Sequence, residues 1–125
     1  MNHNSVGKIG EKIAANFLLA QGYELLDANQ TNQRGYQIGE LDLIAKDKQG
    51  SIVFVEVKTR KGKRGNVVPE ENITSSKIVK IQRAANYYLR VNDLVDKNWR
   101  IDAVVIVLDF FTRKMDIKHI KHIRI

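Results

Sequence analysis

Two apolar segments joined by a short turn signal place the strongest constraint on how this chain can fold. Residues 40–46 and 51–59 are rich in Leu, Ile, Val and Phe, a composition typical of β-strands. The four residues between them, 47–50, read Asp-Lys-Gln-Gly, and this sequence favours a tight turn in which Gly50 takes the left-handed conformation. We therefore predict an antiparallel β-hairpin over residues 40–59.

The segment that precedes the hairpin carries the periodicity of an amphipathic helix, with apolar residues at steps of three and four. Ser5 is a suitable N-cap, and Gly22 stands where a left-handed residue commonly ends a helix. The sequence therefore predicts a helix over residues 6–21. Its apolar stripe consists of Val6, Ile9, Ile13, Phe17 and Leu18.

The rest of the chain predicts one further helix and three further strands. A hydroxyl side chain within residues 74–76 can cap the second helix, which has an apolar face. Strands are predicted over residues 23–29, 100–109 and 115–120. The resulting order is helix, three strands, helix and two strands. We interpret residues 1–125 as one α/β domain with a mixed central β-sheet flanked by helices.

The composition indicates which classes of molecule this chain is suited to bind. The chain has 21 Lys and Arg against 14 Asp and Glu, a formal charge of +7, and such an excess favours polyanions such as nucleic acid. Cysteine is absent, which excludes thiolate metal sites and fits a reducing, cytoplasmic compartment. No apolar run approaches the roughly 18 residues that span a bilayer, and no signal peptide is recognised. No basic amphipathic helix with a Trp or Phe face is recognised either, so we expect no membrane partner.

Three charged side chains interrupt the apolar hairpin. Asp42 lies in its first strand, and Glu56 and Lys58 lie in its second. Burying such charges is costly unless a partner compensates them. A three-residue loop would pair Asp47 with Ser51 and place Asp42 opposite Glu56. A loop of two or four residues would put the two acids on opposite faces of the sheet. We expect the three-residue loop.

The opposed acids of this register predict a site for a divalent cation. Two carboxylates about 5 Å apart repel each other unless they share a proton or a cation. Oxygen ligands suit Mg²⁺ or Mn²⁺, and the backbone carbonyl of Val57 could be a further ligand. Such an ion would polarise a phosphate oxygen and activate a bound water, while Lys58 would orient the water or stabilise developing charge. The alternative is an ion-pair cluster without metal.

Other charged residues surround these three. Glu40 either joins the site or is an exposed charge at a strand end. The basic segment that leaves the second hairpin strand could clamp a phosphate backbone, and the alternative is a solvated run of charge. Lys77 could extend this surface at the start of the second helix. The cations of the basic segment are Arg60, Lys61, Lys63 and Arg64.

Two further groups of polar residues are better explained by structure than by chemistry. Asp102 follows Arg100 by two residues in a predicted strand, so pairing with Arg100 or support of the sheet edge accounts for it better than catalysis. His119 and His122 are three residues apart on a predicted strand. They should face opposite sides and make a poor metal pair.

The pattern Asp42, thirteen residues, then Glu56-Val57-Lys58 resembles the PD-(D/E)xK signature of restriction-endonuclease-like nucleases, with Leu41 in place of its proline. The longer pattern resembles the uncharacterised YraN family of bacteria, which is distantly similar to archaeal Holliday junction resolvases. The matching pieces are Gly7, Gly10-Glu11, Gly22-Tyr23, residues 39–44 and 54–60, Lys77 and Arg100-Ile101-Asp102.

This resemblance implies a restriction-endonuclease-like core in which Asp42 and Glu56 bind the metal and Lys58 is catalytic. It also implies that Glu11 is a further acidic residue of the site, whereas from the residues alone Glu11 is an ordinary solvated helix residue. The implied activity is metal-dependent hydrolysis of DNA phosphodiester bonds, at branched structures, which favours DNA over RNA as the partner.

Three functions are compatible with these observations. The first is the metal-dependent endonuclease, for which a homodimer would supply the two active sites that symmetric cutting needs. The second is a non-catalytic nucleic-acid-binding module that retains the nuclease fold. The third is a protein-interaction domain whose basic surface meets an acidic partner.

Overall fold

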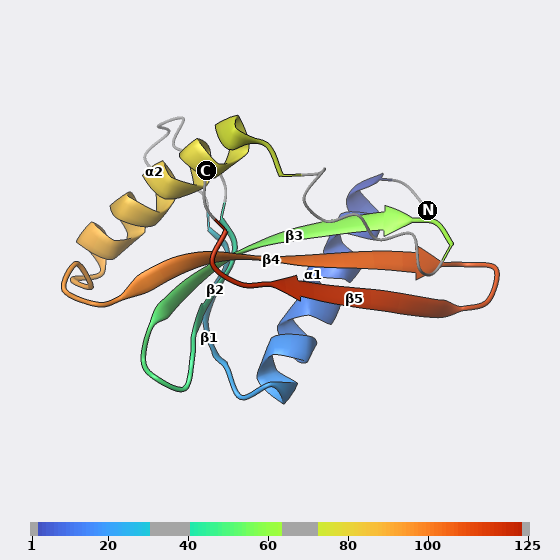
Figure 1. Cartoon of the computed structure of the whole chain (residues 1–125), viewed down its shortest axis with the longest axis horizontal. Coiled ribbons are helices and arrows are strands. Elements are labelled where there is room, and N and C mark those ends of the chain that lie inside the picture. The colour runs from blue at the N-terminus through green and yellow to red at the C-terminus, as the bar shows by residue number, and fades with distance from the viewer. Residues whose placement is uncertain (1–2, 31–40, 64–72, 124–125) are drawn as a thin grey trace.

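The computed structural model describes residues 3–30, 41–63 and 73–123. Within these residues two helices and five strands follow the predicted order of helix, three strands, helix and two strands (Figure 1). Each strand lies within two residues of its predicted bounds. In chain order the elements are α1 (His3–Ala20), β1 (Glu24–Gln30), β2 (Leu41–Lys46), β3 (Ile52–Lys61), α2 (Ser75–Val91), β4 (Trp99–Asp109) and β5 (Lys114–Ile120).

The strands form a mixed sheet in the order β1-β2-β3-β4-β5. Neighbouring strands are antiparallel except β3 and β4, which run parallel and are connected through α2. β3 pairs with β4 as far as Lys61 opposite Leu108, whereas its ladder with β2 reaches only Val55 opposite Leu43. The second half of β3, with the adjoining parts of β4 and β5, therefore extends beyond β1 and β2 as a three-stranded arm (Figure 1).

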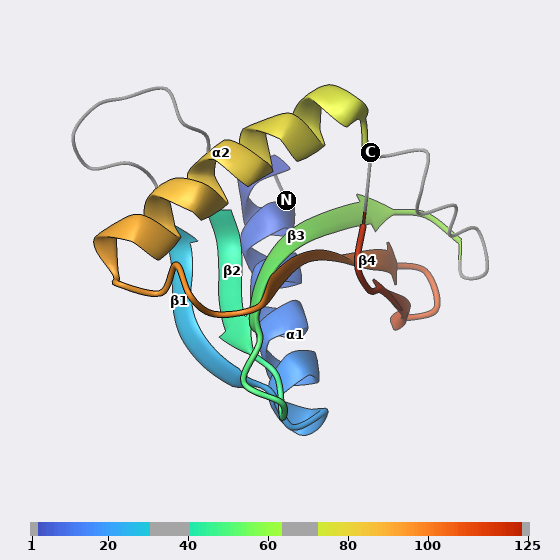
Figure 2. The same ribbon diagram turned by 60° about the vertical axis from the view of Figure 1, so that its left-hand side comes forward.

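The sheet separates two apolar cores, with α1 and α2 on opposite faces (Figure 2). Side chains of β3 alternate between the faces: Phe54 packs toward α2, and Val53 and Val55 pack toward α1. Thr74 caps α2 by accepting a hydrogen bond from the backbone N–H of Lys77. Among the described residues, no helix has the length and apolarity needed to cross a membrane. The predicted apolar face of α2 is confirmed, since the following residues are all buried: Ile78, Ile81, Ala85, Tyr88 and Leu89.

The start and end of α1 differ in how well they were predicted. Gly22 has a φ of 93°, and the backbone N–H of Tyr23 donates to the carbonyl of Leu18, as in a glycine-terminated helix. The C-terminal prediction is therefore confirmed. The N-cap prediction is wrong, because α1 begins at His3 and Ser5 lies inside it.

The buried side of α1 includes two residues of the predicted stripe, Val6 and Leu18, but small residues occupy its centre. Gly10 and Ala14 are buried, whereas Ile9, Ile13 and Phe17 remain partly exposed at its flank. The predicted centre of the stripe is therefore wrong. Small side chains let the helix backbone approach β3 closely, and the larger residues then pack around that contact. Periodicity alone weights large apolar residues and misses this preference.

The close approach at Gly10 makes a stability prediction. A Cβ atom at Gly10 would lie 1.7 Å from Oγ1 of Thr59, whereas one at Gly7 would meet nothing within 4 Å. We expect Gly10→Ala to destabilise the fold by about 2 kcal/mol through overpacking. The control Gly7→Ala should stabilise it by up to about 1 kcal/mol, because alanine favours helix. Urea unfolding measures both, and equal effects of the two substitutions would contradict the contact.

Candidate metal centre

The β2–β3 hairpin has the predicted three-residue loop. The backbone N–H of Asp47 donates to the carbonyl of Ser51 at 3.0 Å, and Gly50 has a φ of 90°. The ladder then continues to its last pair, Leu43 opposite Val55. The predicted register is therefore confirmed.

One step beyond that pair, Asp42 and Glu56 come together on the α2 face of the sheet. Their side chains are within hydrogen-bonding range of each other. Oδ2 of Asp42 also accepts a hydrogen bond of 2.9 Å from the backbone N–H of Val57. This bond holds the carboxylate of Asp42 against β3 at the point where the β2–β3 ladder ends.

Glu56 has an environment that resists its negative charge. The residue is 4% exposed, and burial, followed by repulsion from Asp42, raises its pKa from 4.5 to about 7 even though Lys77 opposes the shift. Near neutral pH the acid pair therefore holds a proton for part of the time. A divalent cation can replace that proton, and its binding then releases the proton.

Lys77 occupies a place that the sequence did not predict. Its Nζ lies 3.2 Å from Oε1 of Glu56, because the first turn of α2 lies over the face of β3 that carries Glu56. The nucleic-acid contact predicted for Lys77 is untested, but the structure places its ammonium at the acid pair. A signal was present, since Lys77 stands in the first turn of the helix that returns the chain from β3 to β4.

Lys58 follows Glu56 by two residues on the same strand and so shares its face of the sheet. It is partly exposed. In the described part of the chain, no ion pair joins Lys58 to Asp42 or Glu56. Its ammonium is thus available beside the acids, on the side toward the arm, and its catalytic role stays a prediction.

The remaining predicted site residues are not gathered at the acid pair. Glu11 is half-buried on α1, and the contact of the adjacent Gly10 with Thr59 puts this turn against the opposite face of β3 from Glu56. Its role in the site stays a prediction. Arg60 is partly exposed, while Lys61 and Lys63 are exposed toward the end of the arm. Glu40 and Arg64 lie outside the described residues.

The donors at the acid pair fit a magnesium or manganese ion. Over residues 3–30, 41–63 and 73–123, no group of three or more Asp, Glu or His side chains converges. Mg²⁺ commonly uses one or two carboxylates and completes its shell with water and substrate phosphate. Asp42 and Glu56 satisfy that requirement. The backbone carbonyl of Val57 remains a predicted further ligand.

A second polar cluster, on the α1 face, is structural. Asp102 is fully buried and accepts hydrogen bonds from Nε of Arg100 and the backbone N–H of His122, both at 2.9 Å. Nε2 of His119 lies 2.8 Å from its other oxygen. Arg100 also contacts Asp47 of the hairpin turn at 2.6 Å. The predicted pairing of Asp102 with Arg100 is confirmed, and the cluster ties the hairpin turn to β4 and β5.

Comparison with solved structures finds SfsA of Pyrococcus furiosus, determined in complex with Ca²⁺. The two chains share 13% sequence identity with a TM-score of 0.38, and the match covers 99% of this chain and 66% of SfsA.

Comparison with protein families gives a match over most of the chain. Residues 10–106 match the family described as "Uncharacterised protein family UPF0102". A UPF0102 protein of Caldicellulosiruptor bescii is 41% identical over 110 residues, which cover 87% of each chain. A UPF0102 protein of Clostridium kluyveri is 38% identical over 120 residues, which cover 95% of this chain and 93% of the relative. The chain therefore belongs to the UPF0102 family.

Proposed function

We propose that this protein is a metal-dependent endonuclease that hydrolyses DNA phosphodiester bonds at the Asp42–Glu56 pair. One observation carries the proposal: the hairpin register brings two carboxylates together, and the buried one has a pKa of about 7. A pair of acids that holds a proton near neutral pH is poised to exchange it for a cation.

Each residue of the site has a defined part in this reaction. Asp42 and Glu56 would hold Mg²⁺ or Mn²⁺, which supplies polarisation of the phosphate and a lower pKa for a bound water. Lys58 would donate hydrogen bonds to the phosphoryl oxygens as negative charge develops on them. Hydrolysis forms a bond from the water oxygen to phosphorus and breaks the bond to the leaving sugar oxygen. The attacking water gives up one proton to solvent, and the leaving oxygen takes one up from solvent.

The charge of the chain supports a nucleic-acid substrate. The formal net charge is +7, and the β3 strand that carries Glu56 continues directly into Arg60, Lys61 and Lys63. Cations in this position can neutralise phosphates of a strand that lies across the acid pair.

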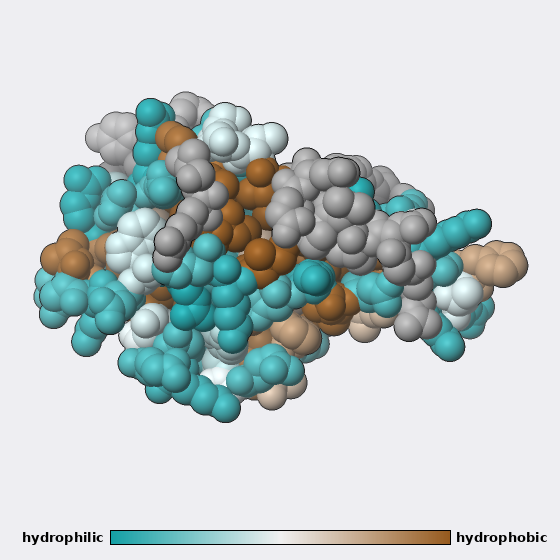
Figure 3. Space-filling model, viewed as in Figure 1, coloured by the Kyte–Doolittle hydropathy of each residue, from teal (hydrophilic) through white to brown (hydrophobic). Residues whose placement is uncertain are grey.

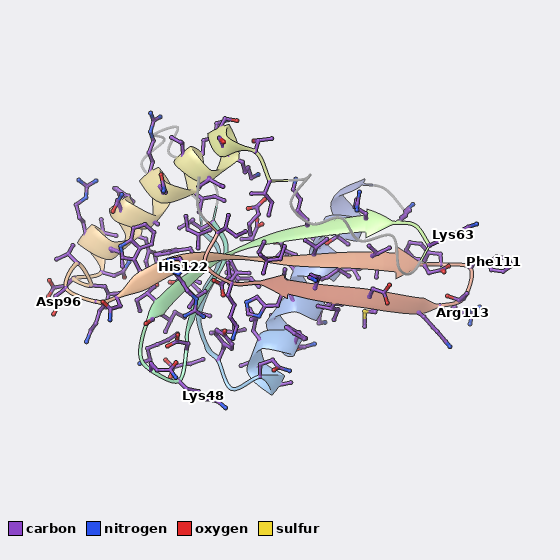
Figure 4. The ribbon with its side chains drawn as sticks, in the orientation of Figure 1. Lys48, Lys63, Asp96, Phe111, Arg113 and His122 are labelled. Carbon is purple, nitrogen blue, oxygen red and sulfur yellow. The ribbon has the colours of Figure 1, made fainter. Side chains whose placement is uncertain are left out.

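Cleavage of branched, single-stranded and duplex DNA with Mg²⁺ or Mn²⁺ tests the proposal. We expect cutting that EDTA abolishes and that falls by at least about 100-fold in Lys58→Ala and in Asp42→Asn. Lys48→Ala is the matched control, because Lys48 is exposed in the hairpin turn and lies away from Lys63 and Phe111 in Figure 4. Cutting that persists in EDTA, or that is equal in Lys58→Ala, would contradict the enzyme.

The ion pair between Lys77 and Glu56 favours a second candidate, a nucleic-acid-binding module without turnover. An ammonium 3.2 Å from Glu56 already neutralises part of the acid pair. In that case the same assays would show binding that weakens with salt, and none of the DNA substrates would be cut.

A further inference from the structure

The end of the arm carries an unusual group of exposed side chains. We call this region the arm tip, formed by residues 61–63 at the end of β3 and residues 109–115 from the end of β4 to the start of β5. Phe111 is 97% exposed, and Phe110 is 50% exposed. Figure 3 shows apolar surface projecting at this end among hydrophilic side chains, and Figure 4 shows Phe111 there with Lys63 and Arg113.

The backbone of the arm tip holds these aromatic residues outward. Oδ1 of Asp109 accepts hydrogen bonds from the backbone N–H groups of Phe111 at 3.0 Å and Thr112 at 3.1 Å. Arg113 then closes the turn with a φ of 59°, and Lys114 pairs with Asp109 as β5 begins. The ring of Phe111 is therefore presented on an ordered hairpin turn.

Several cations and one acid, Asp109, lie near the two rings. Nζ of Lys61 lies 5.5 Å from the centre of the Phe110 ring, and Lys63, Arg113 and Lys114 are exposed. An open hollow of about 540 Å³ lies beside Phe110 and is lined in part by Arg113 and Lys114. A flat apolar ring among cations matches a nucleotide, which combines a flat base with a negative phosphate.

We propose that the arm tip binds unpaired nucleotides by stacking a base on Phe111, while the neighbouring cations contact the flanking phosphates. Proteins that bind single strands combine aromatic platforms with basic surfaces in this way. A second copy of the chain fits less well, because two arm tips would bring like charges together. Base stacking needs an accessible base face, so a fully paired duplex would use only the cations.

The position of the arm tip relates this binding to the acid pair. Lys61 follows Glu56 by five residues on β3, which corresponds to about 17 Å at the rise of a strand and to roughly five base steps of 3.4 Å. In a DNA molecule that is cut at the acid pair, nucleotides roughly five steps to one side of the cut would thus lie at the arm tip. The inference rests on the proposed function for its choice of DNA, and it specifies DNA with an unpaired segment near the cut.

Binding measured by fluorescence anisotropy in EDTA tests the inference without any cutting. The probes are a single-stranded oligonucleotide, a blunt duplex and a duplex with a single-stranded flap. We expect Phe111→Ala to bind the first and third about 10-fold more weakly and the blunt duplex as the wild type does. Val95→Ala should change none of them, because Val95 is 64% exposed at the opposite end of the molecule, beside the labelled Asp96 (Figure 4).

The outcomes separate this inference from the proposed function. Equal binding by Phe111→Ala and wild type, or equal weakening on all three probes, overturns the stacking role, and the nuclease stands if wild type still cuts with Mg²⁺. Phe111-dependent binding without any metal-dependent cutting supports the arm tip and overturns the nuclease. A dimer that becomes a monomer in Phe111→Ala, or Phe111-dependent binding to anionic vesicles without DNA binding, assigns the tip to another partner and overturns the inference.

Discussion

Glu56→Gln should stabilise the metal-free protein by on the order of 3 kcal/mol above neutral pH, since one pKa unit corresponds to about 1.4 kcal/mol. Burial, and then repulsion by Asp42, raises the pKa of Glu56 from 4.5 to about 7. The folded protein therefore keeps the Glu56 proton at pH values where the unfolded chain has lost it. The stability from this group is complete below the unfolded pKa and is lost as pH rises through the folded pKa. Glutamine stays neutral throughout.

Urea unfolding in EDTA between about pH 4.5 and pH 8 measures this effect. The difference in the free energy of unfolding between Glu56→Gln and wild type should increase as pH rises and become constant above the folded pKa of Glu56. Glu24→Gln is the matched control, because the Glu24 side chain is 63% exposed and only loosely paired with Lys46. A constant difference between Glu56→Gln and wild type across this range would show that the Glu56 carboxyl has an ordinary pKa.

The same substitution should also remove most of the affinity for Mn²⁺ or Mg²⁺, by at least about 100-fold, because a neutral amide replaces a charged ligand. Wild-type affinity should rise with pH through about 7, since below that pH a proton competes with the ion at Glu56. Calorimetric titration in two buffers of different ionisation heat measures both the affinity and the released proton. Undiminished binding by Glu56→Gln would place the ion elsewhere.

Asp102→Asn should destabilise the protein by about 3 kcal/mol near neutral pH, because it leaves the charge of Arg100 with one partner fewer in a buried site. Burial by itself would raise the pKa of Asp102, but hydrogen bonds from His119, Arg100 and the backbone of His122 outweigh it and lower the pKa. The stability that Asp102 contributes is therefore present above the unfolded pKa, which is 3.8, and is lost as pH falls through the lower folded value.

Denaturant unfolding at about pH 7 and about pH 3 checks this prediction, with the larger loss expected at the higher pH. Asp96→Asn is the control, because Asp96 is exposed, and its effect should stay within about 0.5 kcal/mol. Adding Arg100→Met to Asp102→Asn should cost less than the sum of the two single changes, since neither charge is then left alone. Equal losses for Asp96→Asn and Asp102→Asn would contradict a structural role for the cluster.

Local patterns were sufficient to predict the order of the elements and the apposition of the two acids. The position of Gly50 sets the loop length, and the two-residue period of a strand then determines which side chains share a face. The pairing of Asp42 with Glu56 follows from these two facts. Arg100 and Asp102 are two residues apart on one strand, so their contact was predictable for the same reason.

Helical periodicity was less informative about which side of α1 is buried. The pattern weights large apolar residues and therefore favoured Ile9, Ile13 and Phe17, although the helix packs through Gly10 and Ala14. Whether a helix approaches a sheet through small or large residues depends on the shape of the facing strand. At Gly10 the facing strand, β3, presents Thr59. Nothing in the sequence indicates that these two residues are in contact.

The sequence by itself determined the strands, the register of the β2–β3 hairpin and the charged pair that this register brings together, because these depend on backbone geometry between residues close in the chain. Only the tertiary structure decided which distant residues contact the Asp42–Glu56 pair and which join the polar cluster around Asp102. Lys77 reaches Glu56, and Arg100 reaches Asp47 across 53 positions and Tyr23 across 77. Such contacts depend on how helices and strands stack in space, and that stacking is set by the packing of all the layers at once.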